Sequence, residues 1–435
     1  MSGSVAHLPA GHRVPRILSR AEHPISRSLL SPNTLKVLYR LHRAGFLAYL
    51  VGGAVRDLML GTTPKDFDVG TNARPHQVRQ LFRNARIVGR RFRIVRVLFG
   101  DEVVEVSTFR RSPAAEEPNG DEGGDALAPE PTDEEEYGTP EEDAFRRDFT
   151  VNGLFYNIAD FTVIDYVGGL EDLQRRVIRS IGNPRERFVE DPVRMMRAVE
   201  YAVRLGFSLE PETAAAIREH FREIRRAAPA RLAYELAESL KSGCAAGIFR
   251  GLWEFGLLTE VLPFAATYDS QKQDMLFRLL AQADALKPRR ALGEEALFAL
   301  VVWPWLAQPL ADAAAGNLPW GQLEEEIKAK VGEMAQLLAF SHFRGHLIRY
   351  GLLDLARLSQ EPRSPRRAVR LVRHEAFPVA MDLLAVQAVA DGDAAKTLAR
   401  WRDIKARVEA GQTPLPEHRG SPGRRRSPRR RRARS

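Results

Sequence analysis

The sequence predicts an α+β protein: a small head that mixes strands and helices, an all-helical body and a disordered basic tail. Three observations lead to this prediction. Up to about residue 180, short apolar runs alternate with glycine turns, which is typical of strands joined by short helices. Beyond about Asp191, apolar residues recur at helical spacing as far as about Val408. The final segment, 424–435, contains eight arginines and no acidic residue.

Composition divides the chain into predicted segments. They are a flexible N-terminal arm (1–30), a head (31–180) with a mobile acidic loop (112–143), a helical neck (181–240), a helical body (241–410) and a disordered tail (411–435). The arm is rich in Pro, His, Ser and Arg but lacks periodicity. Residues 114–143 hold thirteen acids and no Lys or Arg. With few large apolar residues, this stretch cannot build a core.

The overall composition excludes several kinds of site. With 435 residues, 44% of them hydrophobic, the chain can form two or three domains with their own cores. The single cysteine, Cys244, excludes an internal disulfide and a cysteine-based zinc cluster, and we expect it to fill space in the core. The ten histidines lack zinc-ligand spacing and no G-x-S-x-G occurs, so we expect neither a zinc site nor an acyl-transfer triad.

The longest apolar stretch, 296–315, is interrupted by Pro304, Pro309 and Asp312. We therefore expect no transmembrane span, and the N-terminal residues lack the pattern of a signal peptide. Together with the lone cysteine, this predicts a cytoplasmic protein without a membrane partner.

The net charge of +9 is strongly segregated between the acidic loop and the basic remainder. Because Lys and Arg displace counterions from phosphates, a basic body with an arginine tail predicts a polyanionic partner, most simply nucleic acid. For the tail alone, a solvated appendage is an equally good interpretation. Its candidate RNA-binding residues are Arg424, Arg425, Arg426, Arg429, Arg430, Arg431, Arg432 and Arg434.

The head is predicted to open with a helix over about 34–45, followed by a buried strand at 49–51. Gly52 and Gly53 then form a tight turn into a short helix that ends at Gly61. Glycines at such a turn let backbone N–H groups approach a triphosphate. Arg56, on the first turn of that helix, is predicted either to contact phosphate or to pair with Asp57.

Asp66 and Asp68 stand one residue apart before a further strand. If Phe67 and Val69 lie in that strand, the two carboxylates project from one face and can hold magnesium. The alternative is an exposed acid pair on a strand, which is common. The spacing therefore indicates a metal-dependent nucleotidyl transferase, and the preceding glycine pair strengthens this hypothesis.

A helix at 74–82 and a hairpin of two strands, 92–99 and 102–109, are predicted next. In the second strand Glu105 interrupts an apolar or small face. It is either an exposed edge-strand residue or, if the strand lies beside Asp66 and Asp68, a third carboxylate facing the metals. A further hairpin is predicted over 157–165.

Arg146, Arg147, Asp148 and Asn152 place basic, acidic and amide groups in one short stretch. In a helix Asp148 and Asn152 would share a face and could contact a ribose and its phosphates. The alternative is a helix capped by Asp148 with solvated arginines. Further on, the glycine pair at 168–169 indicates a turn into a helix and allows a hinge.

Residues 190–197 are predicted to begin a helix with Asp191 as N-cap and Pro192 in its first position. Asp191, Arg194 and Arg197 would then share one face. An Asp/Arg pair can read a base edge, but a capped helix with an i, i+3 salt bridge explains the same residues. Helices follow at 193–205, 211–225, 231–241 and 246–255.

Together these motifs resemble, in order, those of the class II tRNA nucleotidyltransferase/poly(A) polymerase family. The segments that carry the resemblance are 50–57, 65–68, 146–152, 165–173, 190–194 and 231–236. Within this family the chain is more similar to the poly(A) polymerase branch, through residues 23–27, the helix at 34–45, residues 88–93 and the arginine-rich tail.

The resemblance implies a polymerase-β-like head in which Asp66 and Asp68 bind two Mg²⁺ ions, with Asp148 also functional. It further implies ribose contact from Arg147, Asp148 and Asn152, base selection by Asp191 and Arg194 in the neck, and RNA binding by the body. The implied reaction is template-independent addition of AMP from ATP to RNA 3′ ends, with RNA-decay or RNA-chaperone proteins as candidate partners. The acidic loop departs from the compact loop of many relatives.

Two rival hypotheses remain open at this point. A CCA-adding enzyme that uses CTP and ATP on tRNA shares the same motifs. A non-catalytic RNA-binding protein with a degenerate transferase head is the rival of another class, although the intact carboxylates argue against it.

Overall fold

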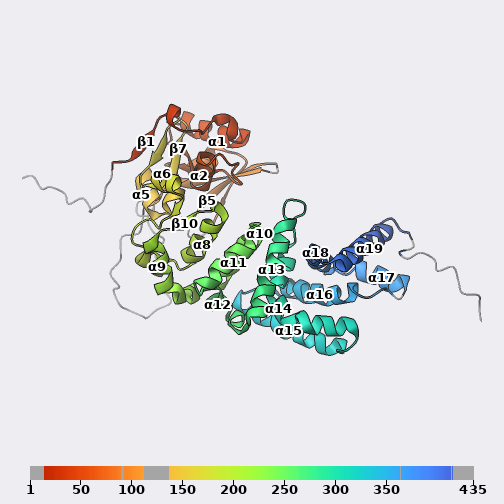
Figure 1. The fold of residues 1–435 in the computed structure, drawn as a ribbon. Helices are drawn as coiled ribbons and strands as arrows, with labels where there is room; N and C mark the ends of the chain where they lie inside the picture. Colours follow the sequence, from red (N-terminus) through yellow and green to blue (C-terminus); the bar gives the residue numbers. More distant parts are fainter. Residues whose placement is uncertain are drawn as a thin grey trace, which may run out of the picture. The chain divides into compact units, whose positions relative to one another are not determined.

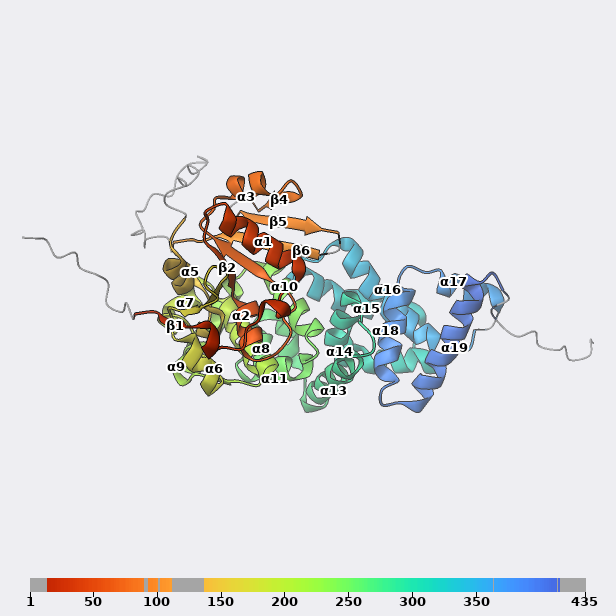
Figure 2. The same cartoon turned by 90° about the horizontal axis from the view of Figure 1, so that it is seen from above.

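The structure is a computed structural model that describes residues 14–89, 93–100, 102–111, 137–362, 364–412 and 414. Contacts divide the chain into two compact units, one of residues 1–235 and 247–263 and the other of residues 236–246 and 264–435. Figures 1 and 2 show the elements of both units. The tail arginines and most of the acidic loop lie outside the described residues.

Within the described residues of the first unit, eight strands form one mixed sheet in the order β1-β8-β7-β2-β3-β6-β5-β4. β3 and β6 are parallel, and the other neighbours are antiparallel. Both predicted hairpins are confirmed as β5–β6 and β7–β8. The strands are β1 (Arg16–Leu18), β2 (Ala48–Val51), β3 (Asp68–Thr71), β4 (Ala85–Val88), β5 (Ile94–Phe99), β6 (Glu102–Thr108), β7 (Leu154–Asn157) and β8 (Val163–Asp165).

Short helices pack on this sheet. α1 begins where the Ser31 side chain accepts a hydrogen bond from the Thr34 N–H. Its apolar stripe packs on β2, β3 and β6, and α3 packs on β4, β5 and β6. The helices are α1 (Pro32–Arg43), α2 (Gly53–Met59), α3 (Pro75–Leu81), α5 (Pro140–Arg146), α6 (Gly169–Arg175) and the 3₁₀ turn η3 (Thr150–Asn152).

The predicted flexible arm is wrong for the part of it that the structure describes. β1 pairs with β8 and so extends the sheet. Ile25 is fully buried and Leu30 nearly so, and the ring nitrogen Nε2 of His23 lies 2.8 Å from the Phe161 carbonyl oxygen. The partners of β1 and His23 lie more than a hundred positions away, so local periodicity could not predict these contacts. Residues 1–13 lie outside the described residues.

The predicted mobile loop extends too far toward its C-terminal end. Tyr137 bridges to Arg110, and α5 starts at Pro140 rather than near Ala144. Thr139 and Glu142 form a capping box, which gives the short helix its start. The acids predicted to keep this stretch mobile therefore stabilise a helix N-terminus.

The first unit continues with helices and a small parallel pair, β9 (Val177–Ile178) with β10 (Ser208–Leu209). α8 has the bounds that the sequence predicts. The helices are α7 (Pro184–Glu190), α8 (Val193–Leu205), α9 (Pro211–His220), η4 (Phe221–Arg226), α10 (Pro229–Lys241), α11 (Ala245–Glu254) and α12 (Leu257–Val261), of which α10 and α11 each contain residues of both units. Cys244, before α11, is only half-buried, so its predicted place in the core is wrong. β4 and α7 were not predicted.

The second unit is helical. Among the described residues, α14 is long and apolar enough to cross a membrane, but 67% of that window is buried inside the protein. It packs against α13, α15, α16 and α18, which accounts for its composition. The helices are α13 (Ser270–Leu286), α14 (Glu294–Ala315), α15 (Trp320–Leu337), α16 (His342–Leu358), α17 (Pro365–Val372), α18 (Phe377–Gln387) and α19 (Gly392–Glu409).

Candidate functional site

The candidate site is built around the start of β3. Asp68 is the first residue of this strand and Asp66 lies two positions before it, so strand alternation does not extend to Asp66. Val69, which follows, is fully buried. β3 runs parallel to β6 with Val69 opposite Val106, which places Asp68 beside Glu105 in the same register. The sheet thus brings Glu105 next to Asp68, which is the position that its interpretation as a third carboxylate requires.

Charge around Asp68 is concentrated. Desolvation raises the pKa of Asp68 to about 6, and the Glu105 carboxylate adds to this effect. The Arg147 guanidinium acts in the opposite direction, while Asp66 raises the pKa further. Asp66, Glu105 and Arg147 are therefore close enough to Asp68 to interact with its charge.

Glu105 is tied to a cation on the neighbouring strand. It lies opposite Arg96 of β5, and Arg96 Nε donates to Glu105 Oε1 over 2.8 Å. Since β6 lies between β3 and β5, Glu105 is not an edge-strand residue. Among the described residues, no group of three or more His, Cys, Asp and Glu side chains is arranged to hold a metal ion. Asp66 and Asp68 stay the predicted metal ligands of the head.

The glycine turn before α2 brings Arg147 close to the backbone. Gly52 has φ 70° and ψ −135°, a conformation that favours glycine. A Cβ at this position would lie 3.0 Å from Arg147 Nη1. Arg147 is itself held by Asp143, 2.9 Å away, one turn earlier on α5. Because Gly52 has no side chain, the Arg147 guanidinium fits against the turn.

Arg56 points into the protein rather than toward solvent. It is 3% exposed, its Nε donates to Asp57 Oδ1 over 2.8 Å, and its Nη1 donates to Asn152 Oδ1 over 2.7 Å. Of the two predicted roles, the structure contains the pairing with Asp57. The bond to Asn152 connects α2 to η3.

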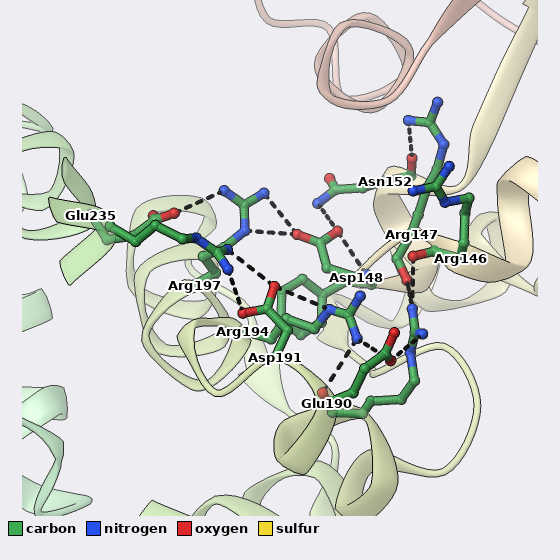
Figure 3. Close-up of polar contacts among 12 residues, drawn as sticks. Arg146, Arg147, Asp148, Asn152, Glu190, Asp191, Arg194, Arg197 and Glu235 are labelled. Carbon is green, nitrogen blue, oxygen red and sulfur yellow. Dashed lines mark hydrogen bonds and ion pairs between the residues drawn. The ribbon is translucent and has the colours of Figure 1, made fainter. Parts of the chain in front are cut away.

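Asp148 is at the centre of a partly buried polar network (Figure 3). Its Oδ2 accepts hydrogen bonds from Arg197 Nε and Nη2 over 2.9 and 2.7 Å. Its Oδ1 accepts from the Phe149 N–H and from Asn152 Nδ2 over 2.8 and 3.1 Å. Burial alone would raise the pKa of Asp148, but the Arg197 charge and these hydrogen bonds lower it. Arg197 also donates to the Tyr201 hydroxyl and lies 3.6 Å from Glu235.

The contact between Asp148 and Asn152 does not come from an α-helix. Phe149 is extended and η3 spans Thr150–Asn152, so the predicted helical pairing is formed by a bend instead. Sequence reasoning also missed Arg187, whose Nη2 donates to the carbonyls of Arg146 and Arg147 over 2.7 Å each. No local sequence pattern indicates such a contact, because its partners are about forty residues away.

Asp191 does not cap α8 as predicted. α7 ends at Glu190, Asp191 follows as its C-cap, and Pro192 occupies the N-cap position of α8. Arg231 binds both Asp191 oxygens over 2.9 and 3.1 Å. This fork of two hydrogen bonds holds the carboxylate away from the capping position.

Arg194 lies beside Asp191 but makes its shortest contact elsewhere. Arg194 Nε is 3.9 Å from Asp191, whereas Arg194 Nη1 donates to Glu190 over 2.9 Å. Figure 3 shows Asp191 and Arg194 next to the Asp148–Arg197 network. The neck thus presents alternating acids and arginines, with Arg231 as the member that sequence reasoning did not assign.

Comparison with known proteins gives consistent results. The family model described as "Poly A polymerase head domain" matches residues 48–179. The model described as "Probable RNA and SrmB-binding site of polymerase A" matches residues 206–268. Poly(A) polymerase I of Salmonella typhi is 40% identical over 95% of this chain and 93% of its own length. The CCA-adding enzyme of Bacillus subtilis is 42% identical, but over 42% of this chain and 43% of its own length.

Among solved structures, the Bacillus stearothermophilus CCA-adding enzyme in complex with CTP has a similar fold. Its TM-score is 0.61 and its sequence identity 27%, over 86% of this chain and 82% of that chain.

Proposed function

The chain belongs to the family of bacterial poly(A) polymerases I, and we infer from this that it is a nucleotidyltransferase that polyadenylates RNA. It adds AMP from ATP to RNA 3′ ends without a template and releases pyrophosphate. The observation that carries this conclusion is 40% identity along nearly the whole length of both chains. The CCA-adding relative from Bacillus subtilis matches less than half of the chain.

We propose that Asp66 and Asp68 hold Mg²⁺. Magnesium in nucleotide sites is bound by one or two carboxylates together with substrate phosphates, so a pair of carboxylates is sufficient. Desolvation and the neighbouring carboxylates of Glu105 and Asp66 raise the pKa of Asp68, and a bound divalent cation would favour its charged form. The bound ions would neutralise the triphosphate and lower the pKa of the attacking 3′-hydroxyl. Glu105 stays a predicted third carboxylate that would have to leave Arg96.

The chain's own residues position the nucleotide. Arg147, beside Asp68 and over the Gly52 backbone, is placed to contact a phosphate as the fixed charge of the site. The Asp148 carboxylate and the Asn152 amide, already aligned by Arg197 and Arg56, are proposed to contact the ribose. Asp191 and Arg194 are proposed to read the base edge, which requires exchange of their present partners Arg231 and Glu190.

The distinguishing experiment uses labelled ATP or CTP with two primers, an oligo(A) RNA and a tRNA that lacks its 3′ end. We expect ATP to be added repeatedly to oligo(A), with little CTP incorporation. Efficient CTP incorporation that stops after a short fixed addition would instead establish the CCA-adding activity. We propose the cytoplasm as the compartment of this reaction, consistent with a free thiol at Cys244.

The metal assignment is tested by Asp66→Asn and Asp68→Asn. Each should lower AMP transfer by about a hundredfold or more while RNA binding without ATP stays near wild type. Asp274→Asn, an exposed aspartate on α13, is the matched control and should leave transfer unchanged. Unchanged transfer in the Asp66 and Asp68 variants would refute the assignment. Loss of RNA binding together with transfer would indicate misfolding instead.

A further inference from the structure

The helical unit contains an open pocket that the reaction described above does not use. Its volume is about 490 Å³. It lies between the start of α15, one face of α16, α17 and α19, within residues 264–435 and outside both segments matched by the family models. Its lining includes Trp320, Tyr350, Asp354, Gln360, Arg367 and Arg370.

A buried carboxylate fixes one wall of the pocket. Asp354 is completely buried, and its two oxygens contact Arg357 Nη1 at 2.8 Å and His374 Nδ1 at 2.6 Å. Tyr350 lies one turn before Asp354 on α16, and its ring packs edge-on against His374 with centroids 5.4 Å apart. The wall is therefore held in place by hydrogen bonds and ring packing before any ligand binds.

The α17 side of the pocket carries positive charge, and Glu361, the other acid of the lining besides Asp354, pairs with Arg400. Arg367 and Arg370 of α17 line the pocket, and Arg366 and Arg373 line a shallow hollow beside it. All four are exposed. In the part of the chain that the structure describes, none of these guanidinium groups forms an ion pair or a side-chain hydrogen bond, whereas Arg357 pairs with Asp354. Such a cluster of cations attracts an anion.

Aromatic and amide groups lie beside these cations. Trp320 and Tyr350 are half-buried. The Arg357 guanidinium lies over the Trp320 ring, 5.7 Å from its centroid, and His346 packs against Tyr350 with ring centroids 4.4 Å apart, so a base would contact the ring surface that these neighbours leave. The Gln360 side chain, in the loop after α16, provides an amide donor close to the pocket and donates weakly to the Ala314 carbonyl over 3.3 Å. Rings that accept stacked bases, combined with arginines that bind phosphate, are the usual elements of a nucleotide subsite.

We propose that this pocket binds one nucleotide, with its base against Trp320 and Tyr350 and its phosphate against Arg367 and Arg370. The proposal rests on the function proposed above, because RNA and ATP are the nucleotides that a poly(A) polymerase meets. An acidic peptide would use the arginines but has no need of the aromatic surface, so the combination favours a nucleotide.

The test compares the full-length Arg367→Gln/Arg370→Gln protein with a matched control, Arg289→Gln/Arg402→Gln. The control removes two exposed arginines of the same unit that do not line the pocket. Binding of a labelled oligo(A) is measured by fluorescence anisotropy in EDTA, without ATP, at several salt concentrations. We expect the pocket variant to raise Kd about tenfold over the control and to reduce the salt slope by about 0.7, the contribution of the one phosphate contact.

A second variant and a second ligand test the base. Trp320→Ala should raise Kd for oligo(A) about fivefold or more and leave Kd unchanged for an abasic oligonucleotide of the same length. Equilibrium dialysis with labelled ATP separates the two nucleotide sources. Loss of one bound ATP in the pocket variant, with unchanged Kd for oligo(A), would assign the pocket to free nucleotide.

Two results would overturn the proposal. One is a pocket variant that behaves as the control with both oligo(A) and ATP. The other is equal weakening for oligo(A) and the abasic oligonucleotide with no effect of Trp320→Ala, which would indicate a general polyanion surface such as an acidic partner would use. Pocket variants should keep AMP transfer at saturating RNA. A wild-type protein without transfer but with base-dependent binding would contradict the proposed function alone.

Discussion

Two aspartates of the head are held in opposite electrostatic environments. Asp148 receives hydrogen bonds on both oxygens, and the Arg197 charge overcomes the effect of burial and lowers its pKa. Asp68 has Glu105 and Asp66 as neighbours, and desolvation with these charges raises its pKa to about 6 despite the influence of Arg147. The Asp148 carboxylate therefore stabilises the fold. The charged Asp68 carboxylate destabilises it, and a bound cation can offset this loss of stability.

The raised pKa of Asp68 predicts a pH-dependent stability. Because the folded state binds the proton more tightly than the unfolded chain, the Asp68 charge destabilises the fold as pH rises from about 4 to about 6. In EDTA, Asp68→Asn should therefore be more stable than wild type at pH 7.5 but not at pH 4. Since Asp68 is solvent accessible, we expect a gain of at most about 1 kcal/mol.

Urea unfolding of both proteins at pH 4, 6 and 7.5 measures this difference. A difference that does not change with pH, or that grows as pH falls, would contradict the prediction.

Breaking the Asp148–Arg197 pair should lower the free energy of unfolding by more than Asp68→Asn raises it. Arg197→Met leaves the buried Asp148 carboxylate without its cation, and we expect a loss of about 3 kcal/mol in the free energy of unfolding at pH 7. The exposed pair Arg185–Glu219 provides the control, since its side chains are about half exposed. Arg185→Met should cost less than about 1 kcal/mol. Equal losses in the two variants would show that Arg197 contributes no more than a surface ion pair.

At the scale of elements, those with a strong local signal were predicted well. α8 keeps its predicted bounds, and the hairpin β5–β6 turns at Gly100, which has φ 62°. β1 and the Asp191 cap were missed for a shared reason. β1 is stabilised by pairing with β8, and Asp191 is held by Arg231, and both are contacts between residues distant in sequence. Periodicity and capping rules describe neighbours along the chain and contain no information on such partners.

Docking of the N-terminal segment can be measured through Ile25. This side chain is fully buried, so Ile25→Ala should lower the free energy of unfolding by about 3 kcal/mol. Leu29→Ala, at a side chain that is 50% exposed, is the control and should change it by less than about 0.5 kcal/mol. If the segment were the flexible arm that the sequence predicts, both substitutions would be neutral in chemical denaturation.

At the scale of the whole molecule, charge distribution predicts how the enzyme holds RNA. The arginine tail lies outside the described residues, and its two interpretations remain testable. Deleting residues 411–435 should weaken RNA binding and reduce its salt slope by at least about 1, since each phosphate contact contributes about 0.7 on single strands. Replacing the eight arginines with glutamine keeps the length and should act as the deletion does. An unchanged slope would mean that the tail is a solvated appendage.

The sequence by itself determined the α+β class, the order of the motifs and the residue types of the site, because glycine turns, alternating strands and capped helices are local properties. It indicated Asp66, Asp68, Asp148 and Asn152 as site candidates. Tertiary structure alone decided that Glu105 lies beside Asp68, that Arg147 reaches the Gly52 turn and that Arg197 neutralises Asp148. These arrangements depend on sheet register and on packing between distant segments, which residue spacing along one chain does not specify.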